Sequence, residues 1–339
     1  MIWIKLANNP LRRTFTQANL KTTQKMKPVT PWLMFWLFGW PTLFLLGASA
    51  ITASPTVNAH ALSYYQLGQN QNTSLSTLAM NTEPTGSTIL AGIGRGNIAA
   101  FTKAPTDNLV HSPYLQLGPT HSYEPQYPDS GTALYAFAAA KGGAGHIITA
   151  NTIANDEITM VAVEVKNGGV IQDYKWNAVL KGSPLTSLSV TTTGPATLVA
   201  FWWGDGNESI AHRAVPNNGF TVIDSLLPTG LLVQTAVATK DVPAAGSYNV
   251  TWDSGGLEGA QLYLVAVQSA PPALQAYGSA GSLVVSWPIS GDYNLEITTN
   301  LSVTNSWISA TNQPVTVGAL NFITNSTAWG GEFFRLEKP

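Results

Sequence analysis

Short runs rich in Val, Ile, Thr, Tyr and Phe recur along the chain after residue 60, and clusters of Gly, Pro, Asn and Asp separate them. Such runs are typical of antiparallel strands joined by turns. No segment in this region shows a sustained helical period with capping residues. We therefore expect an all-β fold. The clearest predicted strands cover residues 87–93, 133–139, 157–165, 196–203, 231–239, 247–252 and 260–267.

The strands predict two domains. Residues 60–269 carry enough of them for one large antiparallel β-sandwich of jelly-roll or lectin-like type. Pro271 and Pro272 then interrupt the strand pattern, as expected at a domain boundary. Further strands at 282–287, 293–300, 314–323 and 332–337 predict a small β-sandwich over residues 270–339.

Residues 1–59 have the layout of a basic leader followed by a signal peptide. An uncharged apolar run over 32–50 ends in Ala48-Ser49-Ala50, and Ala50 and Ala59 are the two candidate cleavage positions. Met26 opens a leader of ordinary proportions, so we expect translation to start there. An uncleaved membrane anchor is the alternative, because about 20 apolar residues can span a bilayer. Both interpretations predict a secreted or cell-surface protein.

Composition excludes several classes of partner and site. Charged residues make up only 10% of the chain, against roughly 25% in an average soluble protein. Without the leader, 10 basic and 18 acidic residues remain, a net charge of −8. That balance provides no basic surface for nucleic acid. The absence of cysteine excludes disulfides, thiol nucleophiles and Cys-ligated metals.

The C-terminal segment carries a pattern of its own. It runs from a Leu-x-Val-x-Trp strand through "LEITTNL" and a further tryptophan to "FFRL", on Trp287, Leu295, Glu296, Thr299, Asn300, Leu301, Trp307, Phe333, Phe334, Arg335 and Leu336. This pattern resembles the small fibronectin type III-like module that often closes secreted multi-domain β-sandwich proteins of verrucomicrobia and related environmental bacteria. The resemblance covers about residues 273–337 and implies an architecture but no catalytic residues.

The larger domain resembles the β-sandwich units of bacterial surface and secreted proteins, through "STILAGI", "ITMVAVEV" and "AQLYLVAVQ". It departs from their pattern by lacking a D-x-x-G-N-x-Y hairpin, of which only Asp107, Asn108 and a displaced Tyr114 remain. The resemblance implies a lectin-like or adhesive protein.

The stretch "VAFWWGDGNES" places Trp202 and Trp203 on opposite faces of one predicted strand, just before an acidic glycine turn. A strand buried on both faces explains one tryptophan as core. Three interpretations remain for the rest: a strand end with a hairpin turn, a carbohydrate platform, or a cation site. The platform would use Trp202, Trp203, Asp205 and Asn207, and a second aromatic pair is Tyr174 and Trp176. The metal ligands would be Asp205, Asn207 and Glu208, with distant residues completing the six to eight oxygens that calcium prefers.

No catalytic set is predicted. His111, His121, His146 and His212 match no metal or triad motif. Paired carboxylates for glycoside hydrolysis could come from Glu124, Asp129, Asp205 and Glu208. Glu164 alternates with apolar residues, so we expect it to face solvent.

These features favour an exported, non-catalytic binding protein of the cell surface or extracellular space, with polysaccharide or a surface glycan as its ligand. No cofactor is expected apart from calcium. A secreted glycan hydrolase is one alternative. The other is a structural subunit that self-associates through its edge strands.

Overall fold

The computed structural model describes the chain from Ser54 to Glu337 with short gaps. The described ranges are 54–68, 71–109, 114–182, 184–204, 212–256, 258–270, 274–279, 282–288, 293–303, 306–317, 320–326 and 332–337. They form two compact units that divide between Pro271 and Pro272, at the predicted diproline boundary. The predicted leader falls largely outside the described residues. No helix within the described ranges has the length and apolar character needed to cross a membrane.

The fold is all-β, as the sequence predicts, with one short 3₁₀-helix in the described ranges. The first part of the larger unit contains β1 (Thr56–Tyr65), β2 (Ser74–Ser76), β3 (Ser87–Arg95), η1 (Ile98–Ala100), β4 (Thr106–Asp107), β5 (Leu115–Gln116), β6 (His121–Tyr123), β7 (Tyr127–Ala140), β8 (Ile148–Asn151) and β9 (Ile158–Lys166). Its main sheet has the order β1-β9-β3-β7-β5, with β6 also paired to β7. A small sheet has the order β2-β8-β4.

The second part contains β10 (Val170–Val179), β11 (Leu185–Thr186), β12 (Val190–Thr192), β13 (Ala196–Gly204), β14 (Val215–Pro216), β15 (Thr221–Leu226), β16 (Thr235–Val242), β17 (Gly246–Tyr248), β18 (Thr251–Asp253) and β19 (Ala260–Gln268). Its main sheet has the order β10-β19-β13-β16-β15. Two small sheets have the orders β11-β18-β14 and β12-β17.

The two parts share the topology of the main sheet and of one small sheet, and β12-β17 is an addition of the second part within the described ranges. We name them repeat 1 (residues 56–166) and repeat 2 (residues 170–268). In each main sheet the strand that comes first in the chain (β1 or β10) pairs with the one that comes last (β9 or β19), which in turn pairs with β3 or β13. The small sheets β2-β8-β4 and β11-β18-β14 correspond strand for strand. A register shift interrupts β1 at Asn58 and β10 at Gln172, at corresponding points of the ladders with β9 and β19. Hydrogen bonds agree as well: Ile148 N donates to Thr77 Oγ1 and Val250 N to Ser187 Oγ, both at 3.1 Å.

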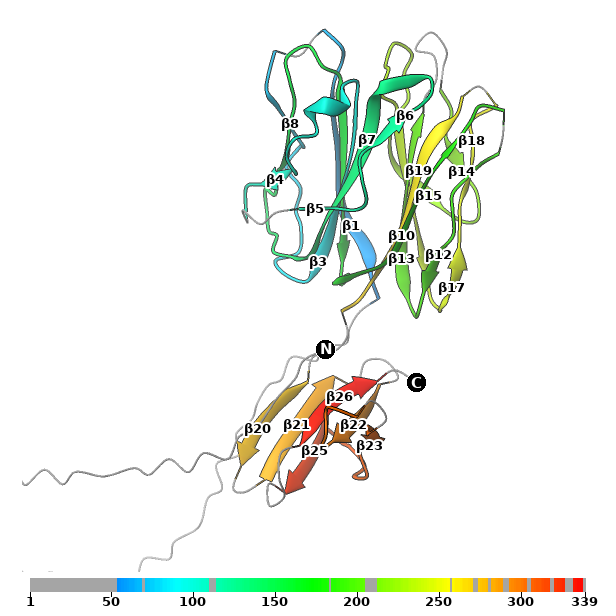
Figure 1. Cartoon of the computed structure of the whole chain (residues 1–339). Coiled ribbons are helices and arrows are strands. Elements are labelled where there is room, and N and C mark those ends of the chain that lie inside the picture. Colours follow the sequence, from blue (N-terminus) through cyan, green and yellow to red (C-terminus); the bar gives the residue numbers. More distant parts are fainter. Residues whose placement is uncertain are drawn as a thin grey trace, which may run out of the picture. The chain divides into compact units, whose positions relative to one another are not determined.

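Four layers result, with the two main sheets in the middle (Figure 1). One core lies between the main sheet of repeat 1 and its small sheet, and includes Ile89, Ile93, Met160, Leu75 and Ile148. A second lies between the main sheet of repeat 2 and its small sheets, and includes Leu198, Trp202, Leu262, Leu185 and Trp252. The third joins the main sheets and includes Leu90, Val163, Phe201, Trp203 and Val265. The single sandwich expected over 60–269 is therefore two sandwiches packed against each other.

The packing between the repeats is asymmetric. Gly92 and Gly94 of β3 face Phe201 and Trp203 of β13, the residues at the corresponding positions of repeat 2. A Cβ added at Gly92 would lie 2.9 Å from the Phe201 ring, and one added at Gly94 would lie 2.7 Å from the Trp203 indole. Glycine at these two positions therefore provides the space that the rings of repeat 2 occupy.

The strands β3, β13 and β19 have a neighbouring strand on each edge and a core on each face of their sheet, so every residue in them is buried. The prediction that Glu164 faces solvent is wrong for the same reason, because its strand β9 also has protein on both sides. The carboxylate is fully buried. It accepts hydrogen bonds from Asn58 Nδ2 at 2.7 Å and from Glu83 N and Ser87 Oγ at 2.6 Å.

The smaller unit contains β20 (Gln275–Ser279), β21 (Ser282–Pro288), β22 (Asn294–Thr298), β23 (Ile308–Ser309), β24 (Val315–Val317), β25 (Leu320–Ser326) and β26 (Phe333–Glu337). They form two sheets, β20-β21-β25-β24 and β23-β22-β26. Leu283, Val285 and Trp287 share its core with Leu295 and Phe334. Arg335 binds Glu296 through Nε at 2.7 Å and Nη2 at 2.6 Å, and its guanidinium lies 4.6 Å from the centre of the Trp307 ring.

The domain boundary predicted at residue 60 cuts through β1, which begins at Thr56. A chain that starts at residue 60 should be less stable than one that starts at residue 51. It loses the β1 ladder before His60 and the Asn58 donor to the buried Glu164 carboxylate. An under-satisfied buried group costs roughly 1–3 kcal/mol. Thermal unfolding of the two chains measures the difference, and equal unfolding temperatures would show that β1 before His60 contributes nothing.

Candidate functional site

Trp202 and Trp203 lie in two different cores, as the alternation predicts. Trp202 is 0% exposed in the outer core of repeat 2, and Trp203 is 1% exposed between the repeats. Neither indole presents a face to a ligand, so the predicted sugar platform at these two residues does not fit their burial. Asp205, Asn207 and Glu208, the predicted polar and metal ligands, lie outside the described residues, as does His111.

Tyr174 and Trp176, the second predicted aromatic pair, are half-buried on β10 and pack against the core between the repeats. The Trp176 indole stacks on the His121 imidazole, with ring centres 3.4 Å apart and planes 7° from parallel. Burial lowers the pKa of His121, which favours the neutral ring. Tyr174 reaches Gly118, where an added Cβ would lie 2.9 Å from the phenol oxygen. These rings fill the junction between β10 and repeat 1, which we call the closed seam.

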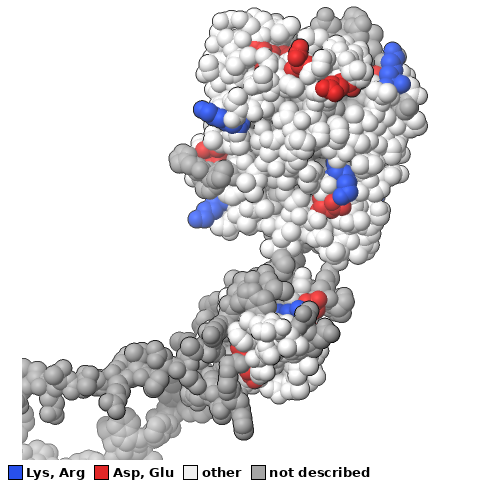
Figure 2. Space-filling view, in the orientation of Figure 1, with Lys and Arg blue, Asp and Glu red and all other residues white. Residues whose placement is uncertain are grey.

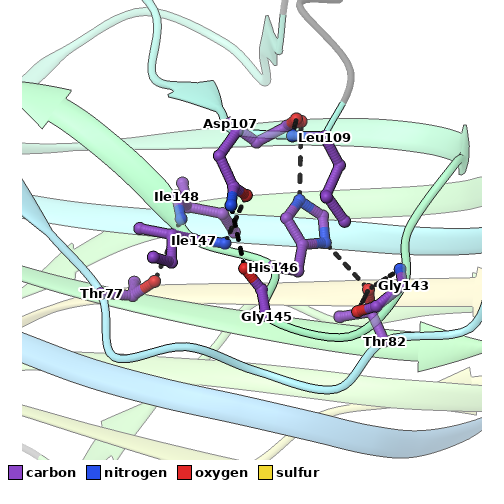
Figure 3. A network of polar contacts seen from close by, with 10 residues as sticks. Thr77, Thr82, Asp107, Leu109, Gly143, Gly145, His146, Ile147 and Ile148 are labelled. Atoms are coloured by element: carbon purple, nitrogen blue, oxygen red, sulfur yellow. Dashed lines mark hydrogen bonds and ion pairs between the residues drawn. The ribbon is translucent and has the colours of Figure 1, made fainter.

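His146 belongs to a buried polar network that joins loops of repeat 1 (Figure 3). Its Nδ1 lies 2.9 Å from Thr82 Oγ1, and its Nε2 lies 3.6 Å from Asp107 Oδ2. A hydroxyl, an imidazole and a carboxylate in this order have the composition of a catalytic triad. The Thr82 hydroxyl is nevertheless engaged by the backbone of Gly143, whose N–H donates to it at 3.0 Å. Thr192 makes a comparable backbone contact in repeat 2, to Ala244 O at 3.1 Å, so we assign the network a structural role.

His212 and Glu258 form a second buried pair, in repeat 2. The His212 Nδ1 atom lies 3.0 and 2.9 Å from the two carboxylate oxygens, and both side chains are 0% exposed. Glu124 and Asp129, the described members of the predicted hydrolase acids, are exposed around the turn between β6 and β7. Within the described ranges, no three or more His, Cys, Asp or Glu side chains are grouped to hold a metal ion.

Two grooves of the described larger unit lie along β1. One groove of 640 Å³ lies between β1 and the segment 78–81, and its lining includes Asn58, Ala59, His60, Leu78, Met80 and Asp224. Another of 470 Å³ lies between β1 and repeat 2, and its lining includes Thr56, His60, Thr221, Thr239, Lys240 and Asp241. We call them the β1 grooves. His60 lines both, and its Nδ1 lies 3.1 Å from Asp224 Oδ2 of repeat 2.

The charged side chains of the β1 grooves are already engaged within the protein. Lys240 Nζ donates to Asn218 O at 2.6 Å. Asp241 accepts from Thr197 Oγ1 at 2.7 Å and from Thr56 Oγ1 at 3.2 Å. Charged side chains are also sparse and scattered on the face shown in Figure 2. The grooves therefore favour a ligand without strong net charge, recognised through hydrogen bonds and apolar contact.

Repeat 2 closes the place that corresponds to the larger groove. Asp173 of β10 corresponds to Ala59 of β1. Asp173 pairs with Ala266 of β19, Ala59 pairs with Glu164 of β9, and these two partners occupy equivalent positions in their strands. Asp173 Oδ2 accepts from Thr191 N at 2.8 Å and from Thr191 Oγ1 at 3.1 Å. Asn177, which corresponds to Ser63, donates to Thr186 O at 3.0 Å and accepts from Leu188 N at 2.9 Å. Ala59 and Ser63 are too short to make these bridges, so the groove of repeat 1 stays open.

His60 is not among the predicted site residues, because it directly follows the predicted leader over residues 1–59. A signal was available: Val57, Ala59 and Ala61 alternate with Asn58 and His60. Such alternation predicts a strand that begins before residue 60. Asp224 could not be found in the same way, since its approach to His60 depends on how the two repeats pack.

Comparison with known proteins found no match to this chain among protein-family models, curated proteins or solved structures.

A buried charge cluster at the end of β3 provides a pH-dependent property. Arg95 is 1% exposed, and its Nη1 donates to Ala100 O at 3.0 Å. Asp156 is 6% exposed. Burial raises the pKa of the Asp156 carboxyl to about 6, although Arg95 and backbone N–H groups act in the opposite direction.

The raised pKa means that the folded protein binds this proton more tightly than the unfolded chain. Stability from Asp156 is therefore full below about pH 4 and is lost as the pH rises through about 6. Asp156→Asn should remove about 1–3 kcal/mol of the stability difference between pH 4.5 and pH 7. Urea unfolding at both pH values measures it, with the exposed Asp129→Asn as control. An unchanged difference in Asp156→Asn would contradict the assignment.

Proposed function

We propose that the chain is an exported, non-catalytic binding protein that holds an extended ligand in the β1 grooves. The observation that carries the proposal is the contrast between two equivalent edges of one scaffold. Repeat 2 bridges its edge with Asp173 and Asn177, whereas repeat 1 leaves a groove of 640 Å³ beside His60. Since the same scaffold closes this edge in repeat 2, we interpret the open edge of repeat 1 as a place for a ligand.

Export rests on the leader over residues 1–59. Thr56 to Ala59 form the start of β1, so we favour cleavage after Ala50 over cleavage after Ala59. A secreted or cell-surface location also agrees with the absence of cysteine and with the few charged residues.

We further propose that each repeat is a jelly roll. With β5 and β6 counted as one strand, repeat 1 has the orders 1-8-3-6-5 and 2-7-4. These orders match the 1-8-3-6 and 2-7-4-5 sheets of a jelly roll, except that strand 5 pairs with strand 6. The smaller unit, with sheets of four and three strands, supports a fibronectin type III-like module. The contact of Glu296, Arg335 and Trp307 links three residues of the sequence pattern on which that resemblance rests. Fold alone does not define the activity, so the binding proposal depends on the grooves.

The alternatives are separable. A glycan hydrolase would use Glu124 and Asp129, and would release product. A structural subunit would pair through the edge strands of two copies and would self-associate without any added ligand. The edge of β10 is bridged to the segment 186–191 by its own side chains, so such pairing would use the edge of β1. A calcium-dependent carbohydrate site at Asp205, Asn207 and Glu208 would bind independently of His60.

The test presents the chain from residue 51 to a glycan array, to insoluble polysaccharides with and without calcium, and to a phage library of random 12-residue peptides. Captured probes should bind the wild type without conversion to product. The double variant His60→Ala, Asp224→Asn should bind at least about tenfold more weakly, because it removes the His60 imidazole and the Asp224 charge between the two grooves.

Gln172→Ala is the matched control, since Gln172 is exposed at the corresponding register shift of β10. Its affinity should equal that of the wild type. Product release that disappears in Glu124→Gln would establish the hydrolase alternative. Binding unaffected by the His60 and Asp224 changes would place the site elsewhere.

A further inference from the structure

We infer that the ligand of the β1 grooves is an extended polypeptide strand that pairs with the free edge of β1. This inference rests on the proposed function and names the class of its ligand.

The first support is the position of β1 in its sheet. β1 is ten residues long, and among the described strands it pairs only with β9. Its other edge therefore presents backbone N–H and C=O groups at alternate residues, which is a template for a further strand. The larger groove runs beside this edge from Asn58 to Leu62. Its volume of 640 Å³ lies in the range of ordinary ligand sites.

The second support comes from the corresponding edge in repeat 2. There the segment 186–192 of the same chain lies beside the edge strand β10, and its extended part β12 packs against β10. Backbone groups of Thr186, Leu188 and Thr191 bind the Asn177 and Asp173 side chains. In repeat 1 the corresponding segment is separated from β1 by the groove, and Asn58 Nδ2 reaches Asn81 O at 3.2 Å at one end. This scaffold therefore already accepts extended polypeptide beside such an edge.

The third support is the chemistry of the lining. Leu62 and Leu78 provide aliphatic surface, and Leu78 is 73% exposed. No Phe, Tyr or Trp side chain lines either groove in the described part of the chain, although sugar rings are usually held by stacking on such side chains. An added strand needs backbone partners and apolar contacts for alternate side chains. The β1 grooves provide backbone partners and apolar contacts for a strand, but not the aromatic stacking surface that a glycan usually needs.

The experiment selects peptides from the random 12-residue library on the wild-type chain and compares their affinity for two variants. Ala59→Asp, Ser63→Asn introduces into repeat 1 the side chains that bridge repeat 2. It should close the larger groove and weaken peptide binding at least about tenfold. Asp173→Ala, Asn177→Ser makes the reverse change in repeat 2 and should leave the affinity of the β1 grooves unchanged.

Hydrogen exchange provides a measurement specific to strand pairing. A bound peptide should slow exchange of the outward amides of residues 56–65, whereas a ligand held only by side chains should leave most of them unchanged. Thermal unfolding of both variants checks that they are folded. If Ala59→Asp, Ser63→Asn does not fold, the exchange of β1 amides in the wild type still decides the question.

The outcomes separate this inference from the proposed function. Capture of glycans alone, dependent on His60, supports the proposed function and overturns the peptide inference. Peptides that bind without slowing β1 exchange also overturn the inference. Capture of nothing from any library contradicts both.

Discussion

The larger unit depends on the contact between two glycines and two aromatic rings. Phe201 and Trp203 enter the space left by Gly92 and Gly94, and this contact joins the main sheets of the two repeats. Because these are corresponding residues of β13 and β3, the interface is asymmetric although the main sheets of the repeats have the same topology. Two copies of repeat 2 would bring rings against rings at this place, and two copies of repeat 1 would leave it empty. Each repeat is therefore the specific partner of the other.

The two junctions between the edges of the repeats, the closed seam and the β1 grooves, also differ from each other. At the closed seam, Trp176 stacks on His121, and Gln261 Nε2 donates to Ser122 O at 2.7 Å. At the opposite place, His60 meets Asp224 between two grooves. One junction thus holds the repeats together while the other is available to a ligand. The buried polar networks around His146 and His212 stabilise the scaffold, and the network around Glu164 reaches the grooves through Asn58.

Periodicity in the sequence was sufficient to predict the long strands. The runs at 87–93, 133–139 and 196–203 lie within β3, β7 and β13, and the face alternation of Trp202 and Trp203 is confirmed. The run at 231–239 was placed too early, since β16 begins at Thr235. Leu231 and Val233 are buried because an irregular segment packs into the core, where Thr159 Oγ1 donates to Val233 O at 2.9 Å. Apolar content alone cannot separate such a segment from a strand.

The remaining features depend on contacts that local sequence does not encode. Strands of two or three residues, such as β4 and β11, are too short to show a period. The duplication is visible in Leu75-Ser76-Thr77-Leu78 and Leu185-Thr186-Ser187-Leu188, but these segments become informative only when both pair with the same kind of neighbour. The candidate site needs a residue from each repeat, and the contact of His60 with Asp224 depends on how the two repeats pack, which local sequence does not predict.

The most direct test of this account is a double-mutant cycle between Gly92 and Phe201, measured as the free energy of unfolding of the larger unit in the chain from residue 51. Gly92→Ala should destabilise the wild type by about 1–3 kcal/mol, because its Cβ has no space beside the Phe201 ring. In a Phe201→Ala background the same change should cost much less, which gives a coupling of at least about 1 kcal/mol. Costs that add to within about 0.5 kcal/mol would contradict an interlocked contact between the repeats.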